Sequence, residues 1–506
     1  MKRNGASNLV VGALFILGII IGGGVIYGLG ITSAAPSTTT ITGPGTTSTA
    51  TATLTTTVTS AAATATSTVT STVTSTATGT SAPVCLSCLG GINNSMLIGA
   101  AQAAGNLSGT FTIGDLQDLT STLAGQGHDD VVTSGFAISD INAWIQTTSL
   151  AGKVTFQQSL QDYKQDNTLT TTIMNSFLTQ GIHITVGPLN SGTALAVLPF
   201  ANSNQIVMIS PSSTSPLAAI PDDYLFRTPP TDVFQGGADA HEFVQSGVKD
   251  VVILYRNDAY GSALANSTAS NFKAIGGQVE AQIPYDISTS NYVPVLGQLD
   301  SAYKSAVSKF GASAVGIYII SFDEFAEIAV QASTNYPDLL QSPLPWFGVD
   351  GQGNESPLVN STYASVDVQT RLVASYPGFS NNPLTQNICA RQFAARSTLC
   401  TGYTLGTYDD MWLAALAILY CAPQTHYTAT QDGPCMQAVL PSIAAGFLGS
   451  TGVTILNTAG DRLFGSYEFF CIVPGATSGS AKWIVCGTYD AGTQTVTWIV
   501  KPQGIP

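Results

Sequence analysis

The chain has 506 residues, enough for two or three domains, and 44% of them are hydrophobic, so sizeable cores are expected. Only 9% of the residues are charged, against roughly a quarter in a typical soluble domain. The 30 acidic residues outnumber the 16 basic ones, giving a formal net charge of −14, and no segment gathers lysines and arginines. This balance excludes nucleic acid as an expected partner. So few charged residues are consistent with a protein exposed to an acidic medium outside the cell.

An uncharged apolar segment, Leu9 to Ile31, lies close to the N-terminus. It is long enough to cross a bilayer, which takes about 20 apolar residues. Because Lys2 and Arg3 precede it, the positive-inside rule places residues 1–8 in the cytoplasm and the rest of the chain outside the cell. A cleaved signal has a shorter apolar core, although "SAAPS" after the segment resembles a cleavage site. We expect a single-pass transmembrane anchor over residues 9–31, with a signal as the alternative.

The next tract, residues 32–85, consists mostly of Thr, Ser and Ala and repeats "TSTVTST". Such a composition buries too little apolar surface to offset the entropy of ordering the chain. Its aliphatic residues alternate as they do in strands, but no turn signal or partner pattern accompanies them. We predict a disordered stalk, of a composition typical of O-glycosylated segments, followed by a linker over residues 86–107.

From about residue 108 the chain alternates short apolar runs rich in Val and Ile with segments of helical periodicity. Continuous apolar runs of this kind are typical of parallel strands that are covered on both faces. Repeated β-then-α order predicts an α/β, doubly wound fold. The strand-like runs are residues 110–117, 182–189, 205–211, 250–258, 313–321 and 344–351; the helical segments include 130–146, 193–204, 236–247, 262–277 and 323–333.

Polar clusters follow these strands, where an open α/β sheet binds its ligands. Ser191 and Thr193 in "VGPLNSGTA" open a helix, whose N–H groups favour an anion such as a carboxylate. "SPSSTSP" adds Ser213 and Thr214 after the next strand. Taken alone, Ser191 has the alternative of a helix N-cap, and the other hydroxyls have that of turn residues.

Two further strand ends carry an aromatic and an acidic residue. "YRNDAYGSA" supplies Tyr260, and "WFGVDGQGN" supplies Asp350 between glycines that let a ligand approach. Surface packing for Tyr260 and a turn or N-cap role for Asp350 are the alternatives. Hydroxyls and a helix N-terminus for a carboxylate, a phenol wall and an aspartate for an ammonium together describe a site for an α-amino acid.

The ordered set of motifs resembles the type I periplasmic-binding proteins, in particular the branched-chain amino-acid (leucine/isoleucine/valine) binding branch, from about Gly109 to Val500. The motifs, in the family's order, are "FTIGDLQDLTSTLAGQG", "FAISDIN", "VGPLNSG", "MISPSSTSPL", "FRTPPTD", "LYRNDAYGSALA", "FKAIGGQV", "WFGVDG", "GYTLGTYDDMWLAALAI" and "GSTGVTILNTAGDR". The resemblance implies that Ser191 and Thr214 hold the ligand carboxylate, with backbone and hydroxyl contacts from Ser212 and Ser213.

The resemblance also implies that Asp350 pairs with the ligand ammonium and that Tyr260 is one aromatic wall. Phe322 is the best match for the second wall, with Ser321 as the alternative. The opening loop "DLQDLTSTLAGQ" departs from the family pattern, although Asp118 is placed to enter the cleft. A general amino-acid or amide site is therefore better supported than leucine specifically.

The resemblance implies two lobes, joined by three crossovers, that close on a ligand as in a Venus flytrap. Lobe 1 is expected over residues 108–229 and 373–453, and lobe 2 over 230–372 and 454–506.

Eight cysteines form no zinc-type pattern. Three local couples, Cys389 with Cys400, Cys421 with Cys435 and Cys471 with Cys486, suggest disulfides, though spacing alone does not fix the connectivity. Cys85 and Cys88 form either a small disulfide or a redox pair. Five sequons, beginning at Asn93, Asn106, Asn266, Asn354 and Asn360, agree with an exported glycoprotein.

Catalysis is not expected, because no G-x-S-x-G, H-E-x-x-H or P-loop motif occurs and the four histidines stand apart, as His128, His183, His241 and His426. We expect no cofactor and no metal. The sequence predicts an extracellular solute-binding protein that delivers an amino acid or related small polar solute to the permease of an ABC importer. The alternatives are a ligand-sensing ectodomain with a separate membrane partner and a non-binding cell-surface protein.

Overall fold

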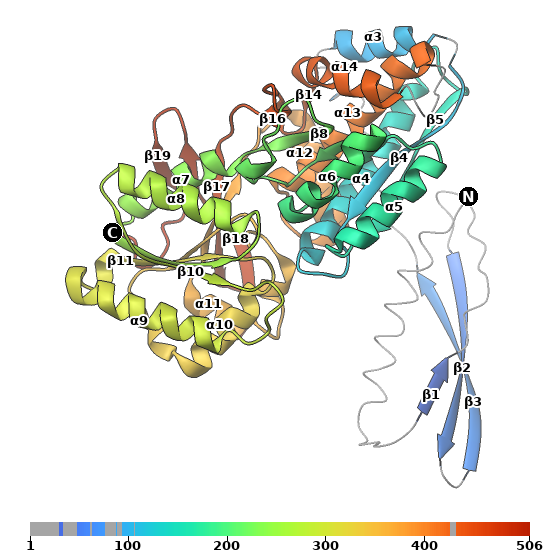
Figure 1. Cartoon of the computed structure of the whole chain (residues 1–506). Helices are drawn as coiled ribbons and strands as arrows, with labels where there is room; N and C mark the ends of the chain where they lie inside the picture. The colour runs from blue at the N-terminus through green and yellow to red at the C-terminus, as the bar shows by residue number, and fades with distance from the viewer. Residues whose placement is uncertain are drawn as a thin grey trace. The chain divides into compact units, whose positions relative to one another are not determined.

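A computed structural model describes residues 30–33, 48–60, 63–75, 85, 88, 94–105, 107–425 and 432–506, in two compact units, Met1–Ser81 and Ala82–Pro506 (Figure 1). The expected membrane anchor lies outside the described residues except for its last two positions, which belong to strand β1 (Gly30–Ser33). Within the described ranges, no helix combines the length and apolar character needed to cross a bilayer.

The N-terminal unit contains a three-stranded antiparallel sheet in the order β1-β2-β3. Strand β2 (Ser48–Ser60) pairs with β3 (Ala63–Ser75) along its whole length, with Ser48 opposite Ser75. The prediction of a disordered stalk is wrong for these residues. The β-branched threonines and valines favour strands, and the alternation of aliphatic residues was the signal for them.

The range predicted as a linker contains helix α3 (Asn94–Ala104), which packs on α13 (Gly402–Thr425). Leu97, Ala100, Ala101 and Ala104 are buried in the same core as α13. Their spacing of three and four residues places them on one face of the helix, and this apolar face explains why the segment folds rather than remaining a linker.

Lobe 1 is built on a six-stranded, wholly parallel sheet in the order β16-β8-β7-β6-β4-β5. Helices α3, α4, α12, α13 and α14 share a core with one face of the sheet, and α5 and α6 share a core with the other. The strands are β4 (Gly109–Gln117), β5 (Val154–Asp162), β6 (Ile184–Val186), β7 (Val207–Ser210), β8 (Leu225–Pro230) and β16 (Asp461–Arg462). The remaining helices are α4 (Ala124–Ile145), α5 (Asn167–Thr179), α6 (Ser191–Asn204), α12 (Pro383–Arg396) and α14 (Asp432–Gly446).

Lobe 2 is built on an eight-stranded mixed sheet in the order β10-β9-β11-β12-β13-β17-β18-β19, parallel as far as β13 and antiparallel after it. The strands are β9 (Asp250–Arg256), β10 (Gln278–Tyr285), β11 (Val315–Ile320), β12 (Trp346–Gly348), β13 (Val373–Pro377), β17 (Tyr467–Pro474), β18 (Ala481–Asp490) and β19 (Thr495–Trp498). Its helices are α7 (Asp232–Gln245), α8 (Gly261–Ala274), α9 (Val293–Phe310), α10 (Phe325–Asn335) and α11 (Ala364–Thr370). Short elements are β14 (Leu448–Gly449), β15 (Gly452–Val453) and 3-10 turns at Pro216–Ala218, Ala312–Ala314, Pro337–Gln341 and Ser356–Val359.

The two sheets divide the chain differently from the prediction at two points. Strand β13, expected to open the second half of lobe 1, pairs with β12 and belongs to lobe 2. Strand β16, expected in lobe 2, pairs with β8 in lobe 1. The crossovers therefore follow β8, β13 and β16, and each connects one lobe to the other (Figure 1). The error arose because a short apolar strand such as "VASYP" fits either sheet, and only its hydrogen-bonded neighbour decides between them.

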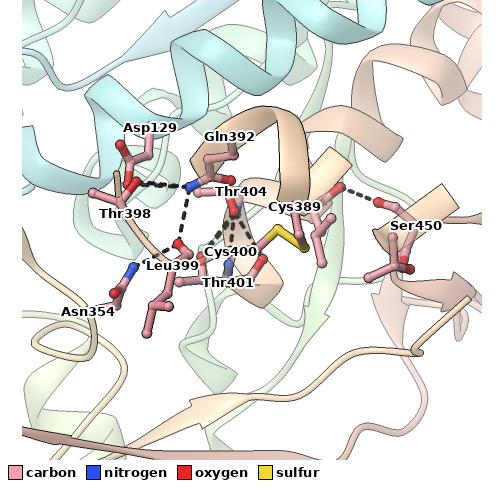
Figure 2. The surroundings of a disulfide bond; sticks show 12 residues. Asp129, Asn354, Cys389, Gln392, Thr398, Leu399, Cys400, Thr401, Thr404 and Ser450 are labelled. Atoms are coloured by element: carbon pink, nitrogen blue, oxygen red, sulfur yellow. Dashed lines mark hydrogen bonds between the residues drawn. A yellow bond between two sulfur atoms is a disulfide. The ribbon is translucent and has the colours of Figure 1, made fainter. Parts of the chain in front are cut away.

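All three local cysteine couples are disulfides, as predicted, and Cys85 and Cys88 form a fourth. Cys471–Cys486 joins the antiparallel pair β17 and β18. Cys389–Cys400 ties α12 to the loop that leads into α13 (Figure 2). An exported protein is the usual setting for such bonds.

The loop braced by Cys389–Cys400 contacts lobe 2. Asn354 Nδ2 donates to the carbonyl of Leu399 at 3.0 Å, and Gln392 donates to the same carbonyl at 3.2 Å (Figure 2). Because Asn354 is only 8% exposed, its sequon is not accessible in this fold, unlike the prediction for it. The disulfide thus fixes a loop that contacts lobe 2 and precedes Tyr403.

Many carboxyl groups are buried inside the lobes, and burial makes them weak acids. Burial raises the pKa of Asp115 to about 6, that of Asp239 to about 7 and that of Asp367 to about 8. A carboxyl whose pKa is raised by folding binds its proton more tightly in the folded chain than in the unfolded chain. The free energy of unfolding should therefore be greatest below about pH 4, the ordinary pKa of aspartate, and should fall as pH rises towards about 8.

Asp367 on α11 offers the sharpest test of this pH dependence, because both its carboxylate oxygens lack a hydrogen-bond partner among the described residues. We expect Asp367→Asn to be more stable than the wild type at pH 8 and to show a smaller loss of stability between pH 4 and pH 8. Urea unfolding at the two pH values measures this. Asp222→Asn, at an exposed position, is the control and should keep the wild-type slope. An unchanged slope in Asp367→Asn would contradict the assignment.

Candidate functional site

In lobe 1, hydrogen-bond donors converge on one hydroxyl oxygen at the carboxyl ends of the strands. Ser191 is the first residue of α6, directly after β6, and its Oγ is buried. It accepts the backbone N–H groups of Thr214 at 3.2 Å and Ser215 at 3.1 Å, and the hydroxyl of Ser213 donates to it at 3.3 Å. Two N–H groups and a hydroxyl aimed at one oxygen form the kind of cradle that binds a carboxylate.

Ser212, which lies next to this cradle, uses its hydroxyl to bind the backbone of its own lobe. Its hydroxyl donates to the carbonyl of Leu189 at 3.0 Å, and Ser210 donates in the same way to Pro188 at 2.6 Å. These bonds hold the segment after β7 against the segment after β6. Ser212 still lines the cavity, but its hydroxyl is engaged with the backbone.

In lobe 2, Asp350 follows β12 and faces this cradle. Its carboxylate accepts hydrogen bonds from the phenols of Tyr260 and Tyr403 and from Gln235 Nε2, the last at 2.9 Å. Burial raises the pKa of the Asp350 carboxyl, and the three hydrogen bonds oppose that rise. The two tyrosine hydroxyls donate hydrogen bonds to the Asp350 carboxylate, as an ammonium group would.

A stack of side chains forms one wall of the site. The rings of Tyr260 and Phe322 lie 5.3 Å apart at 22°, and the Arg256 guanidinium lies 3.5 Å from the Phe322 ring centroid. Arg256 is held by Asp258 and Glu324, each at 2.7 Å. Phe322 lines the cavity, whereas the alternative match to the second wall, Ser321, accepts a hydrogen bond from Gln352.

The cavity between these groups is small. It measures about 10 Å³, room for about one water molecule, and is lined by residues of both lobes. The lining residues are Leu123, Gln126, Leu189, Asn190, Ser191, Ser212, Tyr260, Phe322, Asp350, Gly351 and Tyr403. A cavity of this size is too small for an amino acid.

Asp118, predicted to enter the cleft, instead folds its own loop. Its carboxylate accepts the backbone N–H groups of Ser121 at 2.8 Å and Leu123 at 3.0 Å, and the side chain of Gln165 at 2.7 Å. Its oxygens are therefore used inside lobe 1, and the loop presents Leu123 to the cavity in place of a carboxylate.

Several residues of the site were not predicted. Tyr403, in "CTGYTLG", lies at the start of α13, and Asp232 is the first residue of α7, directly after the first crossover. Burial and the charge of Asp350 raise the pKa of Asp232. The Thr214 hydroxyl lies close enough to Asp232 to oppose that rise, and among the described residues the hydroxyl of Thr193 lacks a hydrogen-bond partner. A helix start next to a lobe crossover was the available signal for Asp232, whereas nothing in the local sequence marked Tyr403.

The described part of the chain contains no cluster of three or more histidine, cysteine or acidic side chains arranged to hold a metal ion. The donors and acceptors of the site are hydroxyls, phenols, an amide, backbone N–H groups and carboxylates. This set matches recognition of a small polar molecule by hydrogen bonds and charge.

The chain shares sequence and fold with known proteins. The model of the family described as "Receptor family ligand binding region" matches residues 135–470. An uncharacterised protein of Methanocaldococcus jannaschii is 27% identical over 409 residues, covering 78% of this chain and 93% of that protein.

Solved structures agree on the fold. A leucine-binding protein of Thermotoga maritima is 18% identical, with a TM-score of 0.58, over 76% of this chain and 99% of that one. A solute-binding protein of an ABC transporter from Rhodopseudomonas palustris, in complex with 3,4-dihydroxybenzoic acid, is 16% identical, with a TM-score of 0.56, over 78% and 99%. A branched-chain amino-acid binding protein of Streptococcus pneumoniae, in complex with isoleucine, is 19% identical, with a TM-score of 0.55, over 74% and 100%. The chain therefore belongs to the receptor ligand-binding-region family and has the type I periplasmic-binding fold that its motifs predicted.

Proposed function

We propose that this protein is the extracellular solute-binding component of an ABC importer, tethered to the membrane by its N-terminal segment, and that it binds a small polar solute such as an amino acid. One observation carries the proposal: the carboxylate cradle on lobe 1 and the carboxylate of Asp350 on lobe 2 face a single cavity. Solved structures of the same fold in complex with leucine, isoleucine, benzoate and 3,4-dihydroxybenzoic acid support it.

The polar groups of the site are hydrogen-bonded to one another through contacts that a ligand would replace. Ser191 Oγ accepts the N–H groups of Thr214 and Ser215, where a ligand carboxylate would accept them. The phenols of Tyr260 and Tyr403 donate to Asp350, where a ligand ammonium would donate. Binding an α-amino acid would therefore exchange these partners, and the displaced phenols of Tyr260 and Tyr403 would take new acceptors. A ligand with a carboxylate alone leaves Asp350 with its tyrosines.

Closure of the two lobes around the solute is the event that a permease would recognise. A ligand that contacts both lobes binds the closed form better than the open form and shifts the population towards it. The cavity lining drawn from both lobes supports this mode of binding. A sensor would use the same closure, so a permease that responds to the closed form is the feature that distinguishes import.

The test is the thermal stability of the full chain with amino acids, carboxylic acids, amides and urea. A ligand at 100 times its Kd should add about 2.7 kcal/mol of stability. We expect α-amino acids to give the largest shift, and Ser191→Ala to weaken that ligand about tenfold, since a hydrogen bond to a charged group contributes roughly 1.5–3 kcal/mol.

Ser308→Ala on the exposed face of α9 is the matched control and should bind as the wild type does. If amides or urea stabilise the chain and amino acids do not, the ammonium role of Asp350 is wrong. If no class of solute stabilises it, a non-binding surface protein becomes the better explanation.

A further inference from the structure

Helix α4 of lobe 1 has an N-terminus without a cap of its own. Its N-cap residue, Leu123, offers no side-chain hydrogen bond, and the first turn contains no acidic residue. The N–H groups in the first turn of a helix need acceptors from outside the helix. Gln126 N–H donates to Glu355 Oε2 at 3.0 Å, and the Gly125 N–H lies near enough to the Asp323 carboxyl to oppose the rise of its pKa. Both carboxyl groups belong to lobe 2, so Glu355 caps α4 across the lobe interface.

These two carboxyl groups come from neighbouring strand ends. Asp323 follows β11 and Glu355 lies in the loop after β12, and the two carboxyl groups lie close enough for the charge of Asp323 to raise the pKa of Glu355. Two carboxylates this close repel each other, and the repulsion is relieved when one of them carries a proton. The backbone joins the lobes at the same place, because Asp323 N–H donates to the carbonyl of Thr122 at 3.2 Å.

The charged groups around this pair are acidic and offer it no counter-charge. Glu324, beside Asp323, is engaged with Arg256, and Asp129 is engaged with Arg396. On the lobe 1 side, Asp118 accepts the N–H groups of its own loop, and Asp130 accepts Gln126 Nε2 at 3.0 Å. The arginines in this region are therefore already paired with other acids, and the pair depends on a proton and on the α4 N–H groups for its stabilisation.

We propose that Asp323 and Glu355 form a proton-dependent latch between the lobes: closing takes up one proton, and ionisation of both groups opens the protein. Glu355 is buried and Asp323 is half-buried while the lobes touch, and separation of the lobes would expose both to water. The inference uses the two-lobe architecture and does not depend on the identity of the ligand.

The direction of the pH dependence follows from burial. In the closed form, burial raises the pKa of both carboxyls, and the charges of Glu324 on Asp323 and of Asp323 on Glu355 raise them further. In the open form both groups meet water, where their ordinary pKa is about 4. Between these limits the closed form holds one more proton, so the ratio of closed to open protein falls up to tenfold for each unit by which pH rises. Below about pH 4 this dependence disappears.

The experiment measures closure in the full chain without ligand. Fluorescent labels at Asn175→Cys on α5 and Ser301→Cys on α9, both exposed positions on different lobes, report the distance between lobes by energy transfer. All eight native cysteines are in disulfides, so the labels react only at the two new thiols. We expect the closed fraction to fall as pH rises from 4 to 8.

Glu355→Gln distinguishes the contribution of the latch to the pH dependence from that of the other acidic residues of the cleft. The amide oxygen still accepts Gln126 N–H, and the amide nitrogen donates to Asp323, so the variant resembles the protonated pair permanently. We expect it to stay closed at higher pH, with a slope smaller by one proton; Asp323→Asn carries the same expectation if the first variant folds poorly. Asp367→Asn, buried within lobe 2, is the control and should keep the wild-type closure profile.

Two results would overturn the latch: energy transfer in the wild type that does not change with pH, or a Glu355→Gln profile parallel to that of the wild type. Because no solute is added, a failure here is distinct from a failure of the proposed solute binding, which the thermal-shift series tests.

Discussion

Arg227→Met should lower the free energy of unfolding by about 3–5 kcal/mol, the usual effect of removing one partner of a buried ion pair. Arg227 on β8 is fully buried, and its Nε lies 2.6 Å from Asp461 Oδ1 on β16. The substitution leaves the Asp461 carboxylate buried without a counter-charge. Arg227 Nη1 also donates to the carbonyl of Ser215 at 2.7 Å, so the segment that carries the carboxylate cradle loses a hydrogen bond.

Urea unfolding of the full chain measures the loss, and two variants sharpen it. Lys304→Met removes an exposed pair with Asp300 and should cost less than about 1 kcal/mol. Arg227→Met combined with Asp461→Leu removes both buried charges and should recover much of the stability. If the single variant is as stable as the wild type, or if the double variant is no better than the single one, the buried charge is not the cause.

The alternation of apolar runs and helical segments was sufficient to predict the doubly wound fold, because covered parallel strands leave a strong pattern. The rule that ligands bind at the carboxyl ends of such strands then predicts that Ser191, Thr214, Tyr260 and Asp350 lie in one region. The structure places all four around one cavity or its cradle. This succeeded because their positions depend on strand order, which the pattern of the chain reveals.

Features that depend on tertiary partners could not be predicted in the same way. Tyr403 reaches Asp350 only because the disulfide-braced loop and α13 cross from lobe 1, and nothing in its local sequence records this. Asp118 satisfies its oxygens inside its own loop, which depends on the loop's three-dimensional path. The lobe boundaries predicted at residues 373 and 454 each assigned one strand to the wrong lobe, since strand identity does not reveal which sheet a strand joins. The membrane anchor over residues 9–31 stays a prediction.

Folding and lobe closure should both depend on pH, because both bury carboxyl groups. Carboxyls inside the lobes hold protons that they would lose in an unfolded chain, and the pair at the lobe interface holds a proton that it would lose on opening. Folding and closure should therefore both be favoured in acid. The two effects are separable, because Asp367 lies within lobe 2 and Glu355 lies at the interface.

Gly125→Ala should weaken ligand binding roughly 5- to 150-fold while making lobe 1 slightly more stable. A Cβ at Gly125 would lie 2.0 Å from Glu355 Oε2 and 3.1 Å from Pro357 Cδ in the closed form. Overpacking of this kind typically costs about 1–3 kcal/mol, which corresponds to that range of Kd. The open form has no such clash, and alanine is the better helix former by about 0.5–1 kcal/mol. The substitution therefore destabilises the closed form relative to the open form without lowering the stability of lobe 1.

Gly135→Ala in the same helix is the matched control, because a Cβ at this exposed position meets nothing within 4 Å. It should share the gain in stability and keep the wild-type Kd, measured by calorimetry with the solute that gives the largest thermal shift. The interlobe energy transfer of Gly125→Ala should also stay low at pH 4, where the wild type closes. Equal affinities for the two alanine variants would mean that the lobes close without bringing Glu355 onto the first turn of α4, and the cap across the interface would then have no part in binding.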